Sequence, residues 1–183
     1  MISDAFRRHI VKEMDKIKKS SFLFFVFEEK KHIFGEQQLL EYLVKYKRMR
    51  GIYISLRSTY KETEEMLEAN DIDREKLFII VKGRGKNKHK NSYYLKNAES
   101  LAEISVALND VTSTGKFRFM LFDSYESILT FAGPILARKF IEYLVHDMKA
   151  KDMTSVIVSV EGDASSRLMP YIFNIPDKVL FLG

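Results

Sequence analysis

The chain has 183 residues, a length typical of one globular domain. Of these residues 46% are hydrophobic and 30% charged, and the three prolines and eight glycines exclude collagen-like and low-complexity proteins. It contains no cysteine, so disulfides, thiol nucleophiles, zinc fingers and iron–sulfur clusters are also excluded. The net charge is +5, and residues 1–100 hold 22 basic against 15 acidic side chains, an excess that suits a polyanionic partner but is also found on Lys/Glu-rich surfaces.

Helices and strands are predicted to alternate along the chain. Apolar residues three or four apart predict an amphipathic N-terminal helix over residues 2–18, within an N-terminal segment 1–19. Strands are predicted at residues 22–27, 52–56, 77–81, 117–122, 155–160 and 179–182. Further helices are predicted at residues 37–50, 60–69, 101–111, 134–150 and 164–171. Gly51 ends the first of these, and Pro134 lies in the first turn of the longest.

The strands are apolar at nearly every position, which is typical of parallel strands covered on both faces. The sequence therefore predicts an α/β fold, a mostly parallel central sheet with helices on both faces, in a single domain over residues 1–183. No apolar run approaches the roughly 20 residues of a membrane helix, and the first residues carry no secretory signal. We therefore expect a cytoplasmic protein with no membrane partner.

Ligands of parallel α/β sheets bind at the carboxyl ends of the strands, and one predicted strand ends on an aspartate there. The apolar run Phe117–Phe122 leads directly into Asp123, as in the Walker B motif, whose carboxylate holds Mg²⁺ beside a nucleotide phosphate. An aspartate in this place is also typical of a turn or a helix cap, so the motif alone leaves both interpretations open.

The surrounding sequence resembles the KaiC-like branch of the RecA superfamily of ATPases. The resemblance runs from the strand ending in Asp123–Ser124, through the helix that carries Arg138, to the strand that leads to Glu161. Residues 51–56 and the helix after them are similar to the second strand and helix of that family. The resemblance covers most of residues 20–183 and implies the three-layer architecture of P-loop nucleotidases.

The chain departs from this family at two elements of the ATP site. In the family, the first strand leads into Gly-x-x-x-x-Gly-Lys-Ser/Thr, whose amides and lysine hold the phosphates. Here Gly35 matches the last glycine, but Glu36 stands in place of the lysine and Gln37 in place of the hydroxyl residue. After the second strand, Arg57–Ser58 replace the acidic residue that activates water in the family.

The resemblance and its departures imply a degenerate nucleotide site without catalytic residues. Its members are Gly35, Glu36, Gln37, Asp123 and Ser124. No cofactor and no metal are expected, unless Asp123 holds Mg²⁺ in an ATPase with a non-standard phosphate loop that uses Lys30 and Lys31. That ATPase is a second alternative, and only it would take ATP and Mg²⁺.

The first expectation for function is a non-catalytic, regulatory or scaffolding domain that binds a protein partner or assembles with itself. The N-terminal helix supports this, because its apolar stripe must cover either its own domain or a neighbour. The stripe consists of Ile2, Phe6, Ile10, Met14 and Ile17. A homo-oligomer, most simply a dimer, is expected.

The first alternative is a nucleic-acid-binding module centred on the basic segment 82–96. Its cationic patch for anions or nucleic acid consists of Lys82, Arg84, Lys86, Lys88 and Lys90. Tyr93 and Tyr94 follow the patch and could stack on bases. A solvated basic loop has the same composition, so this alternative needs a binding measurement.

If the patch binds polyanions, replacing its five cations with alanine should remove the salt dependence of binding. Each phosphate contact on a single strand contributes a slope of about −0.7 in log affinity against log salt, because counterions are released. The variant should keep its free energy of unfolding within about 0.5 kcal/mol, as expected for surface sites. Retention on single-stranded RNA and DNA columns over a salt series measures the effect, and no retention of the unmodified protein at low salt would leave only a solvated loop.

Overall fold

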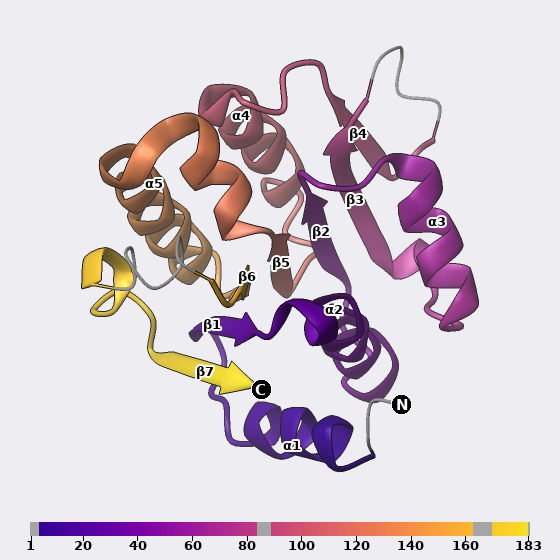
Figure 1. Cartoon of the computed structure of the whole chain (residues 1–183). Helices are drawn as coiled ribbons and strands as arrows, with labels where there is room; N and C mark the ends of the chain where they lie inside the picture. The colour runs from indigo at the N-terminus through magenta and orange to yellow at the C-terminus, as the bar shows by residue number, and fades with distance from the viewer. Residues whose placement is uncertain (1–3, 84–88, 163–169, 183) are drawn as a thin grey trace.

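The computed structural model describes residues 4–83, 89–162 and 170–182. Its seven strands form one sheet in the order β4-β3-β2-β5-β6-β1-β7, and every neighbouring pair is parallel (Figure 1). The strands are β1 Phe22–Phe27, β2 Gly51–Ser55, β3 Leu77–Lys82, β4 Ser92–Leu95, β5 Phe119–Asp123, β6 Thr154–Val160 and β7 Lys178–Leu182. The predicted α/β fold with a parallel sheet is confirmed.

Five α-helices accompany the sheet, and the described residues 170–172 are also helical. The five are α1 Asp4–Asp15, α2 His32–Glu41, α3 Tyr60–Ala69, α4 Leu101–Thr112 and α5 Tyr125–Ala150. A π-helical turn, η2 Tyr42–Tyr46, continues α2, and two short 3-10 turns are η1 Glu29–Lys31 and η3 Arg74–Lys76. Thr59 begins α3 with a capping box, since its side chain accepts from the Glu62 amide while the Glu62 carboxylate accepts from the Thr59 amide. None of the described helices has the length and apolarity to span a membrane.

The sheet separates two hydrophobic cores, because neighbouring residues of a strand point to opposite faces. In β1, Phe22, Phe24 and Val26 pack in the core beneath α4 and α5. Leu23, Phe25 and Phe27 pack in the other core, with α1, α2 and α3. The result is a three-layer arrangement with helices on both faces of the sheet (Figure 1).

The N-terminal helix packs on its own domain. Phe6, Ile10 and Met14 are buried in the core that α1 shares with α2, and Arg7 pairs with Glu41 at 2.9 Å. Ile17 is partly buried against the same core, and Ile2 lies outside the described residues. The described part of the apolar stripe is therefore covered within the chain and does not require a neighbour.

Two helices begin earlier than the sequence pattern predicts. Helix α2 starts at His32 and not at Gln37, so it follows β1 almost directly. Helix α5 starts at Tyr125, and the predicted start at Pro134 marks a break inside it, where Gly133 adopts a φ of 71°. Glycine tolerates this left-handed conformation, and the proline then opens the second part of the helix.

A short strand lies where the sequence predicts only a loop. Residues of β4 pair with β3, with Ile79 opposite Ser92 and Lys82 opposite Leu95. Four residues that are buried only at their two ends, Ser92 and Leu95, leave too short a pattern to identify as a strand. The helix predicted over 164–171 falls mostly on residues 163–169, outside the described residues.

Candidate functional site

The candidate site lies at the carboxyl edge of the sheet, where the chain reverses its direction of winding. Strands β1 and β2 follow each other in the chain but are separated in the sheet by β6 and β5. A parallel sheet opens a crevice for ligands at such a point. The end of β5 places Asp123 there, with Ser55 opposite it at the end of β2.

Asp123 is buried and both of its carboxylate oxygens face side chains of the chain itself. Oδ1 lies 2.9 Å from Nε2 of His32, a distance typical of an ion pair, although the contact lacks hydrogen-bond alignment. Oδ2 accepts a hydrogen bond from the Ser55 hydroxyl at 3.3 Å. The peptide bond from Asp123 to Ser124 is cis.

His32 connects this carboxylate to Arg57. The Nδ1 atom of His32 lies 3.0 Å from a guanidinium nitrogen of Arg57. Because a guanidinium only donates, Nδ1 must accept, which places the ring proton on Nε2, toward Asp123. Nδ1 is thus engaged by Arg57, whereas the buried Nε2 faces Oδ1 of Asp123 without a hydrogen bond.

Glu36 projects from α2 into the same site and is buried. Its carboxylate accepts a hydrogen bond of 2.6 Å from the hydroxyl of Tyr53, on β2. Burial, reinforced by the charge of Asp123, raises the pKa of Glu36 well above its ordinary value. Burial likewise raises the pKa of the Tyr53 hydroxyl, which therefore keeps the proton that it donates.

These side chains line a cavity of about 200 Å³. Its polar lining includes His32, Glu36, Gln37, Tyr53, Arg57 and Asp123, and α3 contributes Thr63 and Met66. The volume is below the roughly 300–1,000 Å³ of common small-molecule sites. Among the described residues, no group of three histidine, aspartate or glutamate side chains is placed to hold a metal ion.

The connection from β1 to α2 is a tight turn. The 3-10 turn η1 directly follows Glu28, and the amide of Lys31 donates to the carbonyl of Glu28 at 2.8 Å. The amide of His32 donates to the carbonyl of Glu29 in the same turn. These amides are therefore engaged within the turn.

Gly35 lies in the first turns of α2, and close packing explains why it is a glycine. A Cβ at this position would lie 2.5 Å from the ring of Phe27, at the end of β1. Such a contact is far inside van der Waals distance, so any side chain would push the helix off the strand. Gly35 therefore allows α2 to approach the sheet closely enough for Glu36 to enter the site.

The remaining predicted members differ in their relation to the cavity. Gln37 lines it and is half-buried. Ser124 is buried at the start of α5, and its hydroxyl lies 3.3 Å from the Ser127 hydroxyl. The structure thus brings Glu36, Gln37 and Asp123 together around one cavity, with Gly35 and Ser124 directly beside it.

The sequence reasoning missed His32 and Tyr53 as members of the site. Each contacts one of the two acidic residues that the resemblance singled out: His32 contacts Asp123, and Tyr53 contacts Glu36. A histidine four residues before Glu36 lies on the same helical face, which is a signal that could have identified it, had α2 been predicted to start at residue 32. Nothing in the sequence indicates that Tyr53 pairs with Glu36.

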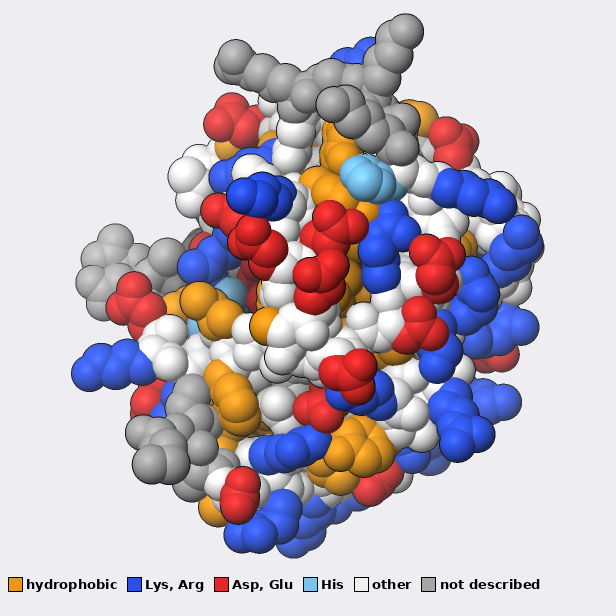
Figure 2. Space-filling model, turned by 90° about the vertical axis from the view of Figure 1, so that its right-hand side faces the viewer, with side chains coloured by type: hydrophobic (Ala, Val, Ile, Leu, Met, Phe, Trp, Pro, Cys, Tyr) orange, Lys and Arg blue, Asp and Glu red, His pale blue; other side chains and the backbone are white. Residues whose placement is uncertain are grey.

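Most of the basic patch lies outside the described residues. This applies to Arg84, Lys86 and Lys88, whereas Lys82 and Lys90 are described and exposed. On the face in Figure 2, lysine and arginine side chains are interspersed with acidic ones. This face therefore has a mixed-charge surface.

Comparison with known proteins points to one family. A family model described as the KaiC ATPase matches residues 28–171. A solved structure of a KaiC-like protein from the hyperthermophilic archaeon Pyrococcus horikoshii OT3 superposes with a TM-score of 0.68 at 11% identity, covering 90% of this chain and 72% of that one. The comparison with curated proteins gave no match.

The raised pKa of Glu36 predicts a specific dependence of stability on pH. Folding favours the protonated acid, so this contribution is complete below the ordinary pKa of 4.5 and is lost as the pH rises through the folded-state pKa. Glu36→Gln keeps the hydrogen bond from Tyr53 without a titrating group. Its free energy of unfolding, relative to the unmodified protein, should therefore increase between about pH 5 and about pH 8.

Urea unfolding of both proteins across this range measures the difference. Glu29→Gln, at an exposed position in η1, is the matched control and should show no such trend. Parallel pH profiles for Glu36→Gln and the unmodified protein would show that Glu36 titrates normally.

Proposed function

The chain belongs to the KaiC family of ATPases, since the family model covers most of its length. We propose that it is a non-catalytic member of this family with a regulatory or scaffolding role. It acts through self-assembly or a protein partner. The observation that carries the proposal is the set of contacts that Asp123 makes. Its carboxylate faces His32 at 2.9 Å and Ser55 at 3.3 Å. A Walker B aspartate acts on Mg²⁺ beside a phosphate, and here side chains of the chain itself take that place.

Glu36 supports the proposal in either protonation state. When it is protonated it supplies none of the positive charge that the family's lysine directs at the phosphates. When it is ionised it repels them, at a cost of about 4 kcal/mol for unit charges about 4 Å apart at an effective dielectric of 20. The residues of the site therefore do not fit a magnesium-bound triphosphate.

The turn after β1 supports the same conclusion. A phosphate loop works because consecutive backbone amides point at the anion, and the amides of Lys31 and His32 are used within η1. Lys31 is also engaged elsewhere, since it lies 3.1 Å from Glu28 and 5.9 Å from the ring centre of Phe6. This disfavours the alternative ATPase, in which Lys30 and Lys31 would replace the missing lysine.

An apolar surface on α4 and α5 is suited to self-assembly. The two helices lie side by side where the Asn109 amide donates to the Tyr143 hydroxyl at 3.1 Å. Val106, one turn before Asn109, and Leu136, two turns before Tyr143, are each 54% exposed. Large apolar side chains on adjacent outer helix faces are typical of protein interfaces, and we take a second copy of this chain as the occupant.

The proposal predicts no hydrolysis of Mg-ATP above background. Asp123→Asn should leave nucleotide binding and phosphate release unchanged, because under this proposal the carboxylate serves its contacts with His32 and Ser55 and takes no part in binding a nucleotide. Isothermal titration with Mg-ATP and a phosphate-release assay measure both quantities, with circular dichroism confirming that the variant is folded. Turnover in the unmodified protein that disappears in Asp123→Asn would overturn the proposal and favour the non-standard ATPase.

Self-assembly predicts a particle heavier than the 21.4 kDa chain at micromolar concentration in light scattering. The double variant Val106→Glu/Leu136→Glu should shift the mass toward that of the monomer, because charge in an apolar interface is costly to desolvate. Ala69→Glu, at an exposed position on α3, is the control and should keep the unmodified mass. A 21.4 kDa particle for the unmodified protein would contradict self-assembly, and a double variant of unchanged mass would place the interface elsewhere.

A further inference from the structure

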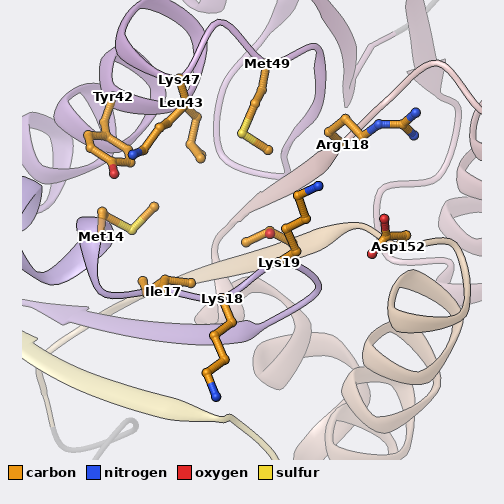
Figure 3. A pocket seen from close by; sticks show the side chains of 11 residues that line it. Met14, Ile17, Lys18, Lys19, Tyr42, Leu43, Lys47, Met49, Arg118 and Asp152 are labelled. Carbon is orange, nitrogen blue, oxygen red and sulfur yellow. The ribbon is translucent and has the colours of Figure 1, made fainter.

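A second and larger cavity, of about 490 Å³, opens at the amino-terminal edge of the sheet, opposite the edge that carries Asp123 (Figure 3). It is bounded by the end of α1, by η2, and by the residues that lead into β2, β5 and β6. Its volume is typical of a site for a small organic molecule. None of its lining residues belongs to the candidate nucleotide site.

One side of this cavity is apolar. Met14, at the end of α1, and Leu43, in η2, are buried, and Met49, just before β2, is half-buried. Figure 3 shows these three side chains around the same space. Methionine side chains are flexible and polarisable, so this side can adapt to apolar groups of different shape.

The other side carries cations without acidic partners. In the described part of the chain, neither Lys19 nor Arg118 has a carboxylate within 4.0 Å, whereas Lys47 is paired with Asp15 at 3.0 Å. In Figure 3, Lys19 and Arg118 lie on the same side of the lining, and the Arg118 guanidinium extends away from Met14, Leu43 and Met49. The single acid of the lining, Asp152, accepts a hydrogen bond from Ser20. The lining therefore has an excess of positive charge.

The backbone around this cavity is unusual for a surface that serves only packing. Ser20, Arg48 and Asp152 flank or line it with φ values of 58°, 54° and 55°, a left-handed conformation that non-glycine residues rarely adopt. The turn η2 that contributes Leu43 is π-helical, a form that is frequent at functional sites. Strain of this kind clusters where a binding surface has to be shaped.

We propose that this cavity binds a small organic anion with an apolar body. The carboxylate or phosphate head lies on Arg118 and Lys19, because a guanidinium pairs with either group through two parallel hydrogen bonds. The apolar body lies against Met14, Leu43 and Met49. The proposal is independent of the state of the nucleotide site, because the two cavities share no residue.

The test uses the full chain and the fluorescent organic anion 8-anilinonaphthalene-1-sulfonate as the probe. Saturable fluorescence enhancement by the folded protein is expected, with displacement by octanoate or octyl phosphate. Octylamine has the same apolar chain with the opposite charge and should not displace the probe. The stronger competitor of the first two identifies carboxylate or phosphate as the preferred head group.

Charge and shape are then tested separately. Lys19→Glu/Arg118→Glu should weaken binding of the probe about tenfold, because two exposed charges are reversed. Met49→Trp should weaken binding, because a bulky ring would take part of the space that the apolar body of the probe occupies. Lys139→Glu, at an exposed position on α5, is the matched control and should bind the probe as the unmodified protein does.

Several outcomes would overturn the proposal. They are the absence of saturable binding, displacement by octylamine as effective as by octanoate, or unchanged binding in either the charge-reversed or the Met49→Trp variant. The last result would place the probe on another apolar surface, such as that of α4 and α5. Matching near-ultraviolet circular dichroism of all variants ensures that binding is compared between folded proteins.

Discussion

Burial of the central strands on both faces is the constraint on which the rest of this molecule depends. All six residues of β1, and all five in each of β2 and β5, are buried. A strand enclosed in this way can place polar groups at its ends, or where a partner satisfies them as Glu36 does the Tyr53 hydroxyl, because an unpaired polar side chain in the middle layer would be costly. Polar chemistry is therefore concentrated at the two edges of the sheet, and both cavities lie there.

The two edges differ in how their charges are satisfied. At the carboxyl edge, His32, Arg57 and Ser55 lie against one another or against Asp123, which leaves a small cavity lined by side chains that face one another. At the amino-terminal edge the cavity is larger, and the hydrogen bonds that Arg118 makes to described residues go to the backbone carbonyls of Gly115 and Phe117. Capacity for an external ligand is thus greater at the edge that sequence motifs did not indicate.

The sequence was sufficient to predict the architecture, because continuous apolar strands leave a pattern that no other arrangement would bury. It also identified Glu36 and Asp123, since both occupy positions of a known motif. The contacts of these two residues could not be predicted from the sequence. His32 reaches Asp123, and Tyr53 reaches Glu36, only after β2, β5 and α2 are assembled. The amino-terminal cavity could not be predicted either, since its lining comes from four separate stretches of the chain with no local pattern.

The contact of Gly35 with Phe27 has a consequence for how lost binding sites are recognised. A glycine that once served an anion can be retained afterwards because an aromatic ring has come to occupy the space beside it, and here that space excludes even a methyl group. Selection for packing would then preserve the residue as firmly as selection for binding did. A retained motif glycine is therefore weak evidence that a ligand binds. The identity of the neighbouring side chains is stronger evidence.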